Sequence, residues 1–222
     1  MRLELGTRVD CTDGLFGELA DVVIDPLTKR VTHLVVKSEE EPSVERLAPV
    51  ELAESRENES RAVTLRATIE EVRALPPVQD VAYLQMGDFP LDDPDWEVGI
   101  QEVYALPYYP AYDLEPGALD YTVMYDRIPK GEVEIRRSSG VYSADGHHLG
   151  HVDGFLVDRD DKITHLVLER GHLWGRREVT IPIGAVTRVK TDDVTLSLIK
   201  DQVETLPQVP VQRWPAPSRR ER

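Results

Sequence analysis

The sequence predicts a mainly β protein that contains two copies of one small barrel, each closed by a short helix. The first observation is an internal repeat, because THLVV at 32–36 returns as THLVL at 164–168. The second is a series of short alternating apolar runs between turn residues, which is typical of half-buried strands. The offset stays at about 131 to 133 residues, and further matches pair 17–25 with 150–158, 47–50 with 181–183 and 75–78 with 206–209.

The first copy, residues 1–78, should contain strands at 8–11, 19–25, 30–38, 45–52 and 62–66. The second and third of these strands should form an antiparallel hairpin, because their connection is short. Pro49 lies inside the next strand and cannot donate to a ladder, so we expect an edge or a bulge there. Thr68 and Glu71 have the spacing of a capping box, which predicts a short closing helix.

The second copy, residues 131–209, should repeat this order with strands at 140–144, 149–158, 162–170, 178–186 and 194–198, then a helix at 199–206. Pro182 takes the place of Pro49 and predicts a second edge or bulge. After it, residues 210–222 carry four arginines and three prolines, and we expect a basic, mobile tail.

The two copies are joined by residues 79–130, a stretch with eleven acidic residues and seven of the eight tyrosines in the chain. Its prolines forbid a long helix. One interpretation is a disordered acidic linker; the other, which the many aromatic residues favour, is an irregular but ordered strap that packs its rings on the barrels. The residues that we consider as candidates for partner recognition in an extended, polyproline-like form are Tyr104, Tyr108, Tyr109 and Tyr112.

Composition restricts the class of partner and the compartment. The net charge is −15 and the sequence pI is about 4.8, so the surface should repel nucleic acid and anionic membranes. No run approaches the roughly 20 apolar residues of a membrane span, and the first residues lack the apolar core of a signal peptide. Cys11 is the only cysteine, and we expect a buried strand residue in a reducing environment. These features predict a cytoplasmic protein.

His33 and His165 are the candidate functional residues that the repeat itself indicates, because they occupy equivalent places in the two copies. Each follows a Thr and precedes an inward-facing Leu, so the imidazole should face outward or lie at the barrel seam. We expect a structural imidazole bonded to backbone or carboxylate, with a pH-responsive or ligand-contacting role as the alternative. If the barrels pack about a pseudo-twofold axis, these two rings would meet.

Other groupings of polar residues do not amount to a recognisable site. His147, His148 and His151 resemble a metal cluster, but neighbours in a strand alternate faces, so we expect a solvated turn. Asp158, with Asp160 and Asp161 after it, lacks the glycine and distal glutamate of a calcium loop and should form a turn. No nucleophile motif and no phosphate-binding loop occurs. The sequence therefore predicts no catalytic, cofactor-binding or metal-binding residues.

Both copies resemble the PRC-barrel family. The residues that carry the resemblance are DGLFGELADVVIDPLTKRVTHLVV and LAPV in the first copy, and DGHHLGHVDGFLVDRDDKITHLVLERG and LWGRREVTIPIGAV in the second. The resemblance covers residues 5–78 and 138–209. The family is a small barrel found in the cytoplasmic part of the photosynthetic reaction-centre H subunit and at the C-terminus of a ribosome-maturation factor. It implies a six-stranded or similar barrel and a binding or adaptor role, with no shared catalytic residues.

Together these observations predict a non-catalytic protein-binding or adaptor module, whose partner is another protein or a second copy of the chain. One alternative is a small-ligand or electron-transfer accessory protein, similar to the H subunit, with its site at the barrel interface. A weaker alternative is an RNA-processing or ribosome-associated factor, which would need a basic stripe that only the terminal arginines begin to offer.

Overall fold

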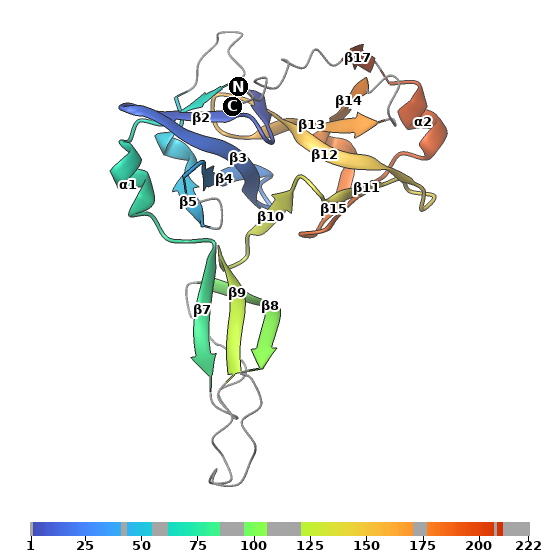
Figure 1. The fold of residues 1–222 in the computed structure, drawn as a ribbon. Coiled ribbons are helices and arrows are strands. Elements are labelled where there is room, and N and C mark those ends of the chain that lie inside the picture. The colour runs from blue at the N-terminus through green and yellow to red at the C-terminus, as the bar shows by residue number, and fades with distance from the viewer. Residues whose placement is uncertain are drawn as a thin grey trace, which may run out of the picture.

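The mainly β prediction is confirmed by the computed structural model, in which strands form three sheets (Figure 1). The structure describes residues 2–40, 44–54, 62–84, 96–105, 121–170, 177–206 and 208–210. Two of the sheets each contain one copy of the sequence repeat. The third is formed by the residues between the copies.

The first sheet contains β5 (Glu45–Pro49), β4 (Arg30–Ser38), β3 (Gly14–Asp25), β2 (Arg8–Cys11) and β6 (Val63–Thr64), in that order, with β10 (Val133–Arg136) paired to the second half of β3. The predicted hairpin of β3 and β4 is confirmed as an antiparallel pair that begins at Asp25↔Arg30. Pro49 ends a strand at the edge of this order, as expected, and the chain then bends through the 3-10 helix η1 (Val50–Leu52).

The second sheet repeats that arrangement with β14 (Arg177–Pro182), β13 (Ile163–Arg170), β12 (His148–Val157), β11 (Gly140–Tyr142) and β16 (Asp193–Leu196). The 3-10 helix η2 (Ile183–Ala185) again follows the proline, and β15 (Val186–Val189) continues the chain on the far side of β16. Two short strands complete the sheet: β17 (Gln208–Pro210) pairs with β14, and β1 (Arg2–Glu4) pairs with β12.

The two sheets exchange a strand. The register pairs Leu3 of β1 with Phe155 of the second sheet, and Ile135 of β10 with Val22 of the first. Leu3 and Ile135 are equivalent in the repeat, and so are Phe155 and Val22. Each copy therefore begins with a strand that lies in the sheet of the other copy, and we call β1 and β10 the exchanged strands.

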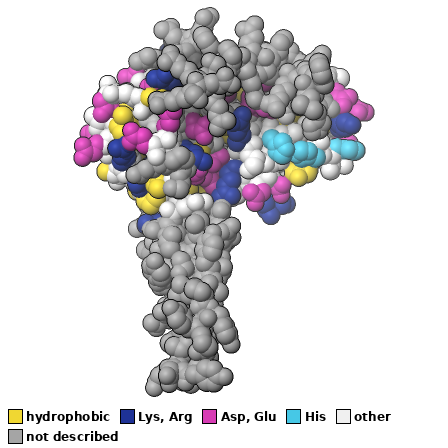
Figure 2. Space-filling model, viewed as in Figure 1, with side chains coloured by type: hydrophobic (Ala, Val, Ile, Leu, Met, Phe, Trp, Pro, Cys, Tyr) yellow, Lys and Arg dark blue, Asp and Glu magenta, His cyan; other side chains and the backbone are white. Residues whose placement is uncertain are grey.

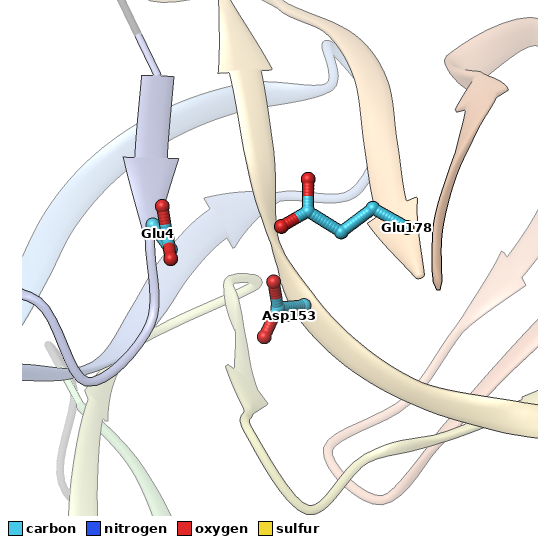
Figure 3. A group of neighbouring side chains, drawn as sticks. All are labelled: Glu4, Asp153 and Glu178. Atoms are coloured by element: carbon cyan, nitrogen blue, oxygen red, sulfur yellow. The ribbon is translucent and has the colours of Figure 1, made fainter. Parts of the chain in front are cut away.

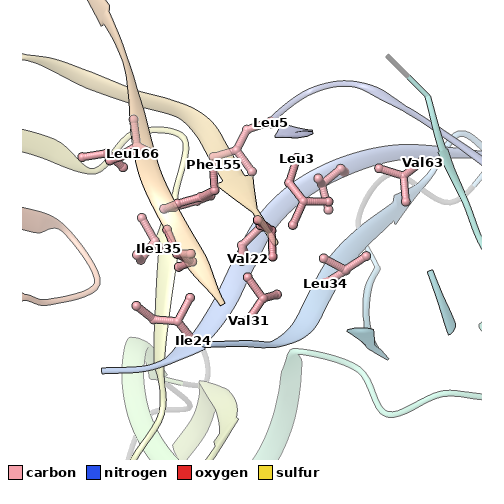
Figure 4. Close-up of a cluster of buried hydrophobic side chains, with 14 of the residues drawn as sticks. Leu3, Leu5, Val22, Ile24, Val31, Leu34, Val63, Ile135, Phe155 and Leu166 are labelled. Atoms are coloured by element: carbon pink, nitrogen blue, oxygen red, sulfur yellow. The ribbon is translucent and has the colours of Figure 1, made fainter. Parts of the chain in front are cut away.

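Because of this exchange, the two sheets share one hydrophobic core (Figure 4). Leu3 and Leu5 from the start of the chain pack in the same buried cluster as Phe155 and Leu166 of the second copy. Ile135 of the other exchanged strand belongs to it as well, and is 2% exposed. Unfolding one copy therefore exposes apolar surface of the other, which makes the two copies one cooperative unit.

The tips of the two repeated hairpins also pair with each other. Val31 N–H donates to the Asp161 carbonyl and Ile163 N–H donates to the Lys29 carbonyl, both at 2.9 Å. Lys29 and Asp161 are equivalent in the repeat and share a left-handed backbone, with φ of 58° and 59°. These reciprocal bonds are what a pseudo-twofold relation between the copies requires.

Two short helices close the repeats: α1 (Ile69–Arg73) and α2 (Lys200–Glu204). The capping box predicted for α1 is confirmed, because Thr68 and Glu71 bond each other's backbone N–H reciprocally. The aspartates of the two Asp-Gly turns add a second cap, since Asp13 accepts from Ile69 N–H and Asp145 from Lys200 N–H. Within the described residues, no helix has the length and apolar character that crossing a membrane would need.

The expectation of an irregular strap between the copies is wrong for much of its length. Residues 79–129 contain β7 (Gln79–Leu84), β8 (Trp96–Ala105) and β9 (Tyr121–Pro129), which form an antiparallel sheet in the order β7-β9-β8. This sheet projects away from the other two instead of lying on them (Figure 1). The prolines fall mainly between the strands, so they exclude a helix and leave the strands intact.

The projecting sheet is attached to the outer face of the first repeat. Val78, which precedes β7, accepts a bond from Arg127 N–H of β9 at 2.7 Å. Val78 and Ile128 pack in a second, smaller buried cluster with Val23, Val35 and Leu47 of the first sheet. Among the described residues, the base of the projecting sheet thus packs on the first repeat.

Candidate functional site

Among the described residues, a group of three acidic side chains with close carboxylate oxygens lies where the exchanged strand β1 meets the second sheet. Carboxylate oxygens of Glu4, Asp153 and Glu178 lie within 4.8 Å of one another (Figure 3). Asp153 and Glu178 are only 4% and 3% exposed. The three residues come from β1, β12 and β14, so only the exchange brings them together.

Arg2 supplies positive charge to this acidic group. Its guanidinium donates to the Glu178 carboxylate at 2.6 Å, and its Nε lies 3.6 Å from the Glu4 carboxylate. A buried carboxylate loses hydration, so a charge-assisted bond of this kind offsets much of the cost of burial. The arrangement is a network of ion pairs that fastens β1 to β14, and oxygen ligands of this kind also suit hard cations.

The first repeat has a different polar group at the equivalent junction. Asp21 of β3 accepts a bond from Arg137 N–H, just beyond β10, at 2.9 Å. Burial raises the pKa of the Asp21 carboxyl from 3.8 to about 6; the Arg137 bond opposes this shift and the nearby Glu45 carboxylate adds to it. Within β10 itself, the Arg136 guanidinium donates to Glu134, which is 1% exposed.

His33 lies beside the entry to the exchanged strand β10. Its Nδ1 is 3.4 Å from the Glu132 carboxylate, an ion-pair distance longer than an ordinary hydrogen bond. Thr32 donates to the same carboxylate at 2.5 Å. His33 therefore has the carboxylate neighbour that the structural interpretation expects, at a position that links β4 to β10.

His165 occupies the matching place on β13 with different surroundings. Its Nδ1 lies 3.1 Å from the Thr164 hydroxyl, which in turn donates to the Leu156 carbonyl at 3.0 Å. In the first repeat the Thr32 hydroxyl also lies 3.2 Å from the Val23 carbonyl, but it shares its one proton with the nearer Glu132 carboxylate. Among the described residues, the His33 imidazole thus contacts Glu132 and the His165 imidazole contacts Thr164, and no contact joins the two rings. A pH-responsive role for either remains a prediction.

The tyrosines proposed for partner recognition fall in two places. Tyr104 belongs to β8 of the projecting sheet, paired with Thr122 of β9. Tyr108, Tyr109 and Tyr112 lie outside the described residues. The extended polyproline-like form proposed for 104–112 does not apply at Tyr104, because a β-ladder holds its backbone.

Three histidines near the start of β12 are exposed on the lobe of the second sheet, where Figure 2 shows histidine side chains gathered. His147 turns to Asp145, with 3.1 Å between Nδ1 and the carboxylate. The rings of His148 and His151 contact each other, with centroids 4.9 Å apart. The expected divergence therefore holds for His147 and His148, whereas His151 joins His148.

The remaining residues singled out from the sequence have structural roles. Asp158 accepts from Asp160 N–H and Lys162 N–H, which makes the expected turn. Cys11 is 6% exposed in β2, as expected of a buried strand residue. Burial, followed by the charges of Asp13 and Asp10, raises the pKa of its thiol to about 11, so this sulfur is a poor nucleophile at neutral pH.

Sequence reasoning missed the group of Glu4, Asp153 and Glu178. About 150 residues separate Glu4 from Asp153, and nothing local indicates that β1 pairs with β12. One signal was available, because Asp153 occupies the position of the apolar Ala20 in the aligned first copy. An acidic residue at a position that packs against an apolar cluster in the other copy indicates a polar partner nearby.

Comparison with known families supports the resemblance for the second repeat. Residues 137–203 match the sequence model of the PRC-barrel domain, which spans β11 to α2 and leaves out the exchanged strand β1. The second repeat is therefore similar in sequence to the PRC-barrel domain. No curated protein matches the chain. For the first repeat, the common strand order and the equivalent turns and caps carry the likeness.

Proposed function

We propose that the chain is a non-catalytic protein-binding module, in which two PRC-type β-barrels form a base and the projecting sheet contacts a partner protein. The aligned residues of the two copies serve packing, turns and helix caps, which supports a scaffold role for both. The PRC-barrel match of the second repeat agrees with a binding or adaptor role.

The observation that carries this proposal is the edge of the projecting sheet. Within the described residues, β7 and β8 each pair with β9 alone, so each has one backbone edge without a neighbouring strand. β8 is ten residues long. An extended peptide can add to such an edge as a further strand, with main-chain hydrogen bonds supplying affinity.

Two neighbouring proline substitutions test this mode of binding. In an antiparallel ladder, consecutive residues direct their N–H groups alternately toward and away from the partner strand. Val103→Pro and Tyr104→Pro therefore remove two neighbouring N–H groups of β8. One of these points away from β9, toward the free edge (the outward variant), and the other points toward β9 (the inward variant). The outward variant should keep its circular dichroism spectrum and lose binding, while the inward variant should also disturb the sheet.

The assay is cross-linked capture of a partner followed by mass spectrometry and a titration with that purified partner. Leu27→Ala, at an exposed hairpin tip far from β8 in the sequence, is the matched control and should bind as the unsubstituted chain does. Binding by the outward variant that equals binding by the unsubstituted chain, or binding that survives replacement of residues 79–130 by a neutral linker, would contradict the proposal.

A further inference from the structure

We infer that His148 and His151 form a two-imidazole site for a borderline divalent transition-metal cation of the zinc, nickel and copper group. This inference is independent of the projecting sheet and of any protein partner. It rests on a β-bulge, on the proton position of one imidazole, and on a comparison with the first repeat.

The bulge places the two rings on one face of the sheet. Residues three apart in a regular strand point to opposite faces. Here the register pairs Tyr142 with His148 and Val141 with Gly150, so Leu149 is an extra residue on β12. Gly150 has a φ of 149°, which favours glycine. The extra residue restores a common face for His148 and His151, whose rings meet at an interplanar angle of 64°.

One ring nitrogen already has the orientation of a metal ligand. The Nδ1 of His151 lies 3.0 Å from the Ser138 carbonyl oxygen. A carbonyl oxygen only accepts, so Nδ1 must carry the proton, and the lone pair of the neutral ring resides on Nε2. A carbonyl that accepts from one ring nitrogen and so fixes the tautomer is typical of histidines that bind metal through the other nitrogen.

The His148 ring also contacts a tyrosine ring on the neighbouring strand β11. The Tyr142 ring packs against it with centroids 5.2 Å apart. A Cβ at Gly140, the residue opposite His151, would lie 2.9 Å from a Tyr142 ring carbon, so the glycine leaves room for the tyrosine ring. Within the described part of the chain, His148 contacts the rings of Tyr142 and His151, and its nitrogens are available to an ion.

The coordination chemistry selects the class of ion. Two imidazole nitrogens on one ion at about 2 Å lie roughly 3 Å apart, which rings with touching edges reach by small rotations. Neutral imidazole suits zinc, nickel and copper, and not magnesium or calcium. Among the described residues, the one three-residue group of close ligand atoms is Glu4, Asp153 and Glu178, so water completes the shell at the imidazoles.

The first repeat shows that the bulge itself does not need the histidines. It has the same register shift, between Val9 and Asp10 of β2, and places Leu15 and Glu18 where the second repeat has His148 and His151. The same backbone is thus built with a partly exposed leucine and a glutamate. The imidazole pair is a feature of the second repeat beyond what the fold requires.

Calorimetric titration of the metal-free full chain with ZnCl₂ or NiCl₂ at pH 7.5 tests the inference. We expect one ion per chain at this site, and a loss of affinity of about tenfold or more in His148→Gln and in His151→Gln. His147→Gln is the matched control, because that ring is exposed and adjacent but pairs with Asp145. This control should bind zinc or nickel as the unsubstituted chain does.

Two further measurements make the outcome decisive. Histidine ¹⁵N NMR should show the Nε2 resonance of His151 shifting on zinc addition while Nδ1 keeps its proton. His148→Leu with His151→Glu, the residues of the first repeat, should keep the fold and abolish this binding. Unchanged affinity in the single variants, an equal loss in His147→Gln, or displacement of zinc by equimolar MgCl₂ would overturn the inference.

Discussion

The two repeats share their strands and differ in what covers their outer faces. In the first repeat, Val23, Val35 and Leu47 form an apolar surface that receives Val78 and Ile128 at the base of the projecting sheet. The aligned positions of the second repeat include a threonine, Thr180, in place of Leu47, and Asp153 in place of Ala20. The shared positions determine the shape of each sheet, and the unshared positions determine what is attached to it.

A similar difference separates the exchanged strands. β1 carries Arg2 and Glu4, whereas β10 carries Glu134 and Arg136, so the two ion pairs run in opposite order along equivalent strands. Each order matches the sheet that receives the strand, because Arg2 bonds Glu178 of the second sheet and Arg136 lies opposite Asp21 in the register of the first. Charge order therefore helps to direct each strand to its own place.

The largest expected effect comes from truncating the two equivalent core residues of the exchanged strands. Leu3→Ala and Ile135→Ala should each lower the free energy of unfolding by about 2 to 5 kcal/mol, because both side chains are buried in the shared core. Urea denaturation followed by circular dichroism should show one transition for each variant. Hydrogen exchange should show β3 and β12 losing protection together.

Leu27→Ala is the control for this pair, since Leu27 is 91% exposed. Two separate transitions, or protection lost only in the sheet that receives the altered strand, would show that the repeats unfold independently and that the shared core does not couple them.

An intermediate effect is expected from Asp21, whose aligned residue in the second repeat is Gly154. Its folded pKa of about 6 lies above the ordinary 3.8, so the folded state binds this proton more tightly than the unfolded state does. The free energy of unfolding should therefore fall as pH rises from about 4 to 6. Asp21→Asn should be more stable than the unsubstituted chain at pH 7.5, by on the order of 1 to 3 kcal/mol.

Denaturant titrations between pH 3.5 and 7.5 measure this dependence. The difference between the two proteins should disappear at the acid end, where the carboxyl is protonated in both states. Asp25→Asn is a control of opposite sign, because bonds from Thr28 and Leu27 hold the pKa of that exposed carboxyl below its usual range. An Asp21→Asn variant that is less stable than the unsubstituted chain at pH 7.5 would contradict the expected direction of this effect.

The smallest effect is expected at the helix caps supplied by the two Asp-Gly turns. Asp13→Ala and Asp145→Ala each remove the acceptor for the first N–H of a helix, so both should lower the melting temperature slightly and by similar amounts. Differential scanning calorimetry measures this. Asp192→Ala, an exposed residue 4.0 Å from Arg136, should change it less. A change in only one of the two cap variants would break the equivalence of the turns.

Hairpins and helix caps could be predicted from the sequence wherever the interacting residues are close along the chain. The hairpin 19–25/30–38 follows from a short turn, and the cap of α1 from the spacing of Thr68 and Glu71. The projecting sheet was missed because composition was given more weight than the alternation within Trp96–Ala105 and Tyr121–Pro129. Charge and proline content do not indicate which residues of this segment form strands, whereas the alternation of apolar and polar residues does.

The candidate sites were harder to predict for two separate physical reasons. The exchange of β1 and β10 depends on pairing across more than a hundred residues, which no local pattern encodes. The contact of His148 and His151 depends on one inserted residue, and strict alternation would place these rings on opposite faces. A bulge changes the face of every residue beyond it, so a prediction that assumes regular strands fails there.

The exchange of strands also has a consequence for how the chain is made. β1 is synthesised before its partner β12, which follows roughly 150 residues later, a wait of about 10 to 30 s at ordinary translation rates. Until then, Leu3 and Leu5 leave the ribosome with no strand to join, and β3 waits for β10 in the same way. Assembly on the ribosome is therefore a late event, and nascent chains that stop before residue 157 expose apolar surface that chaperones recognise.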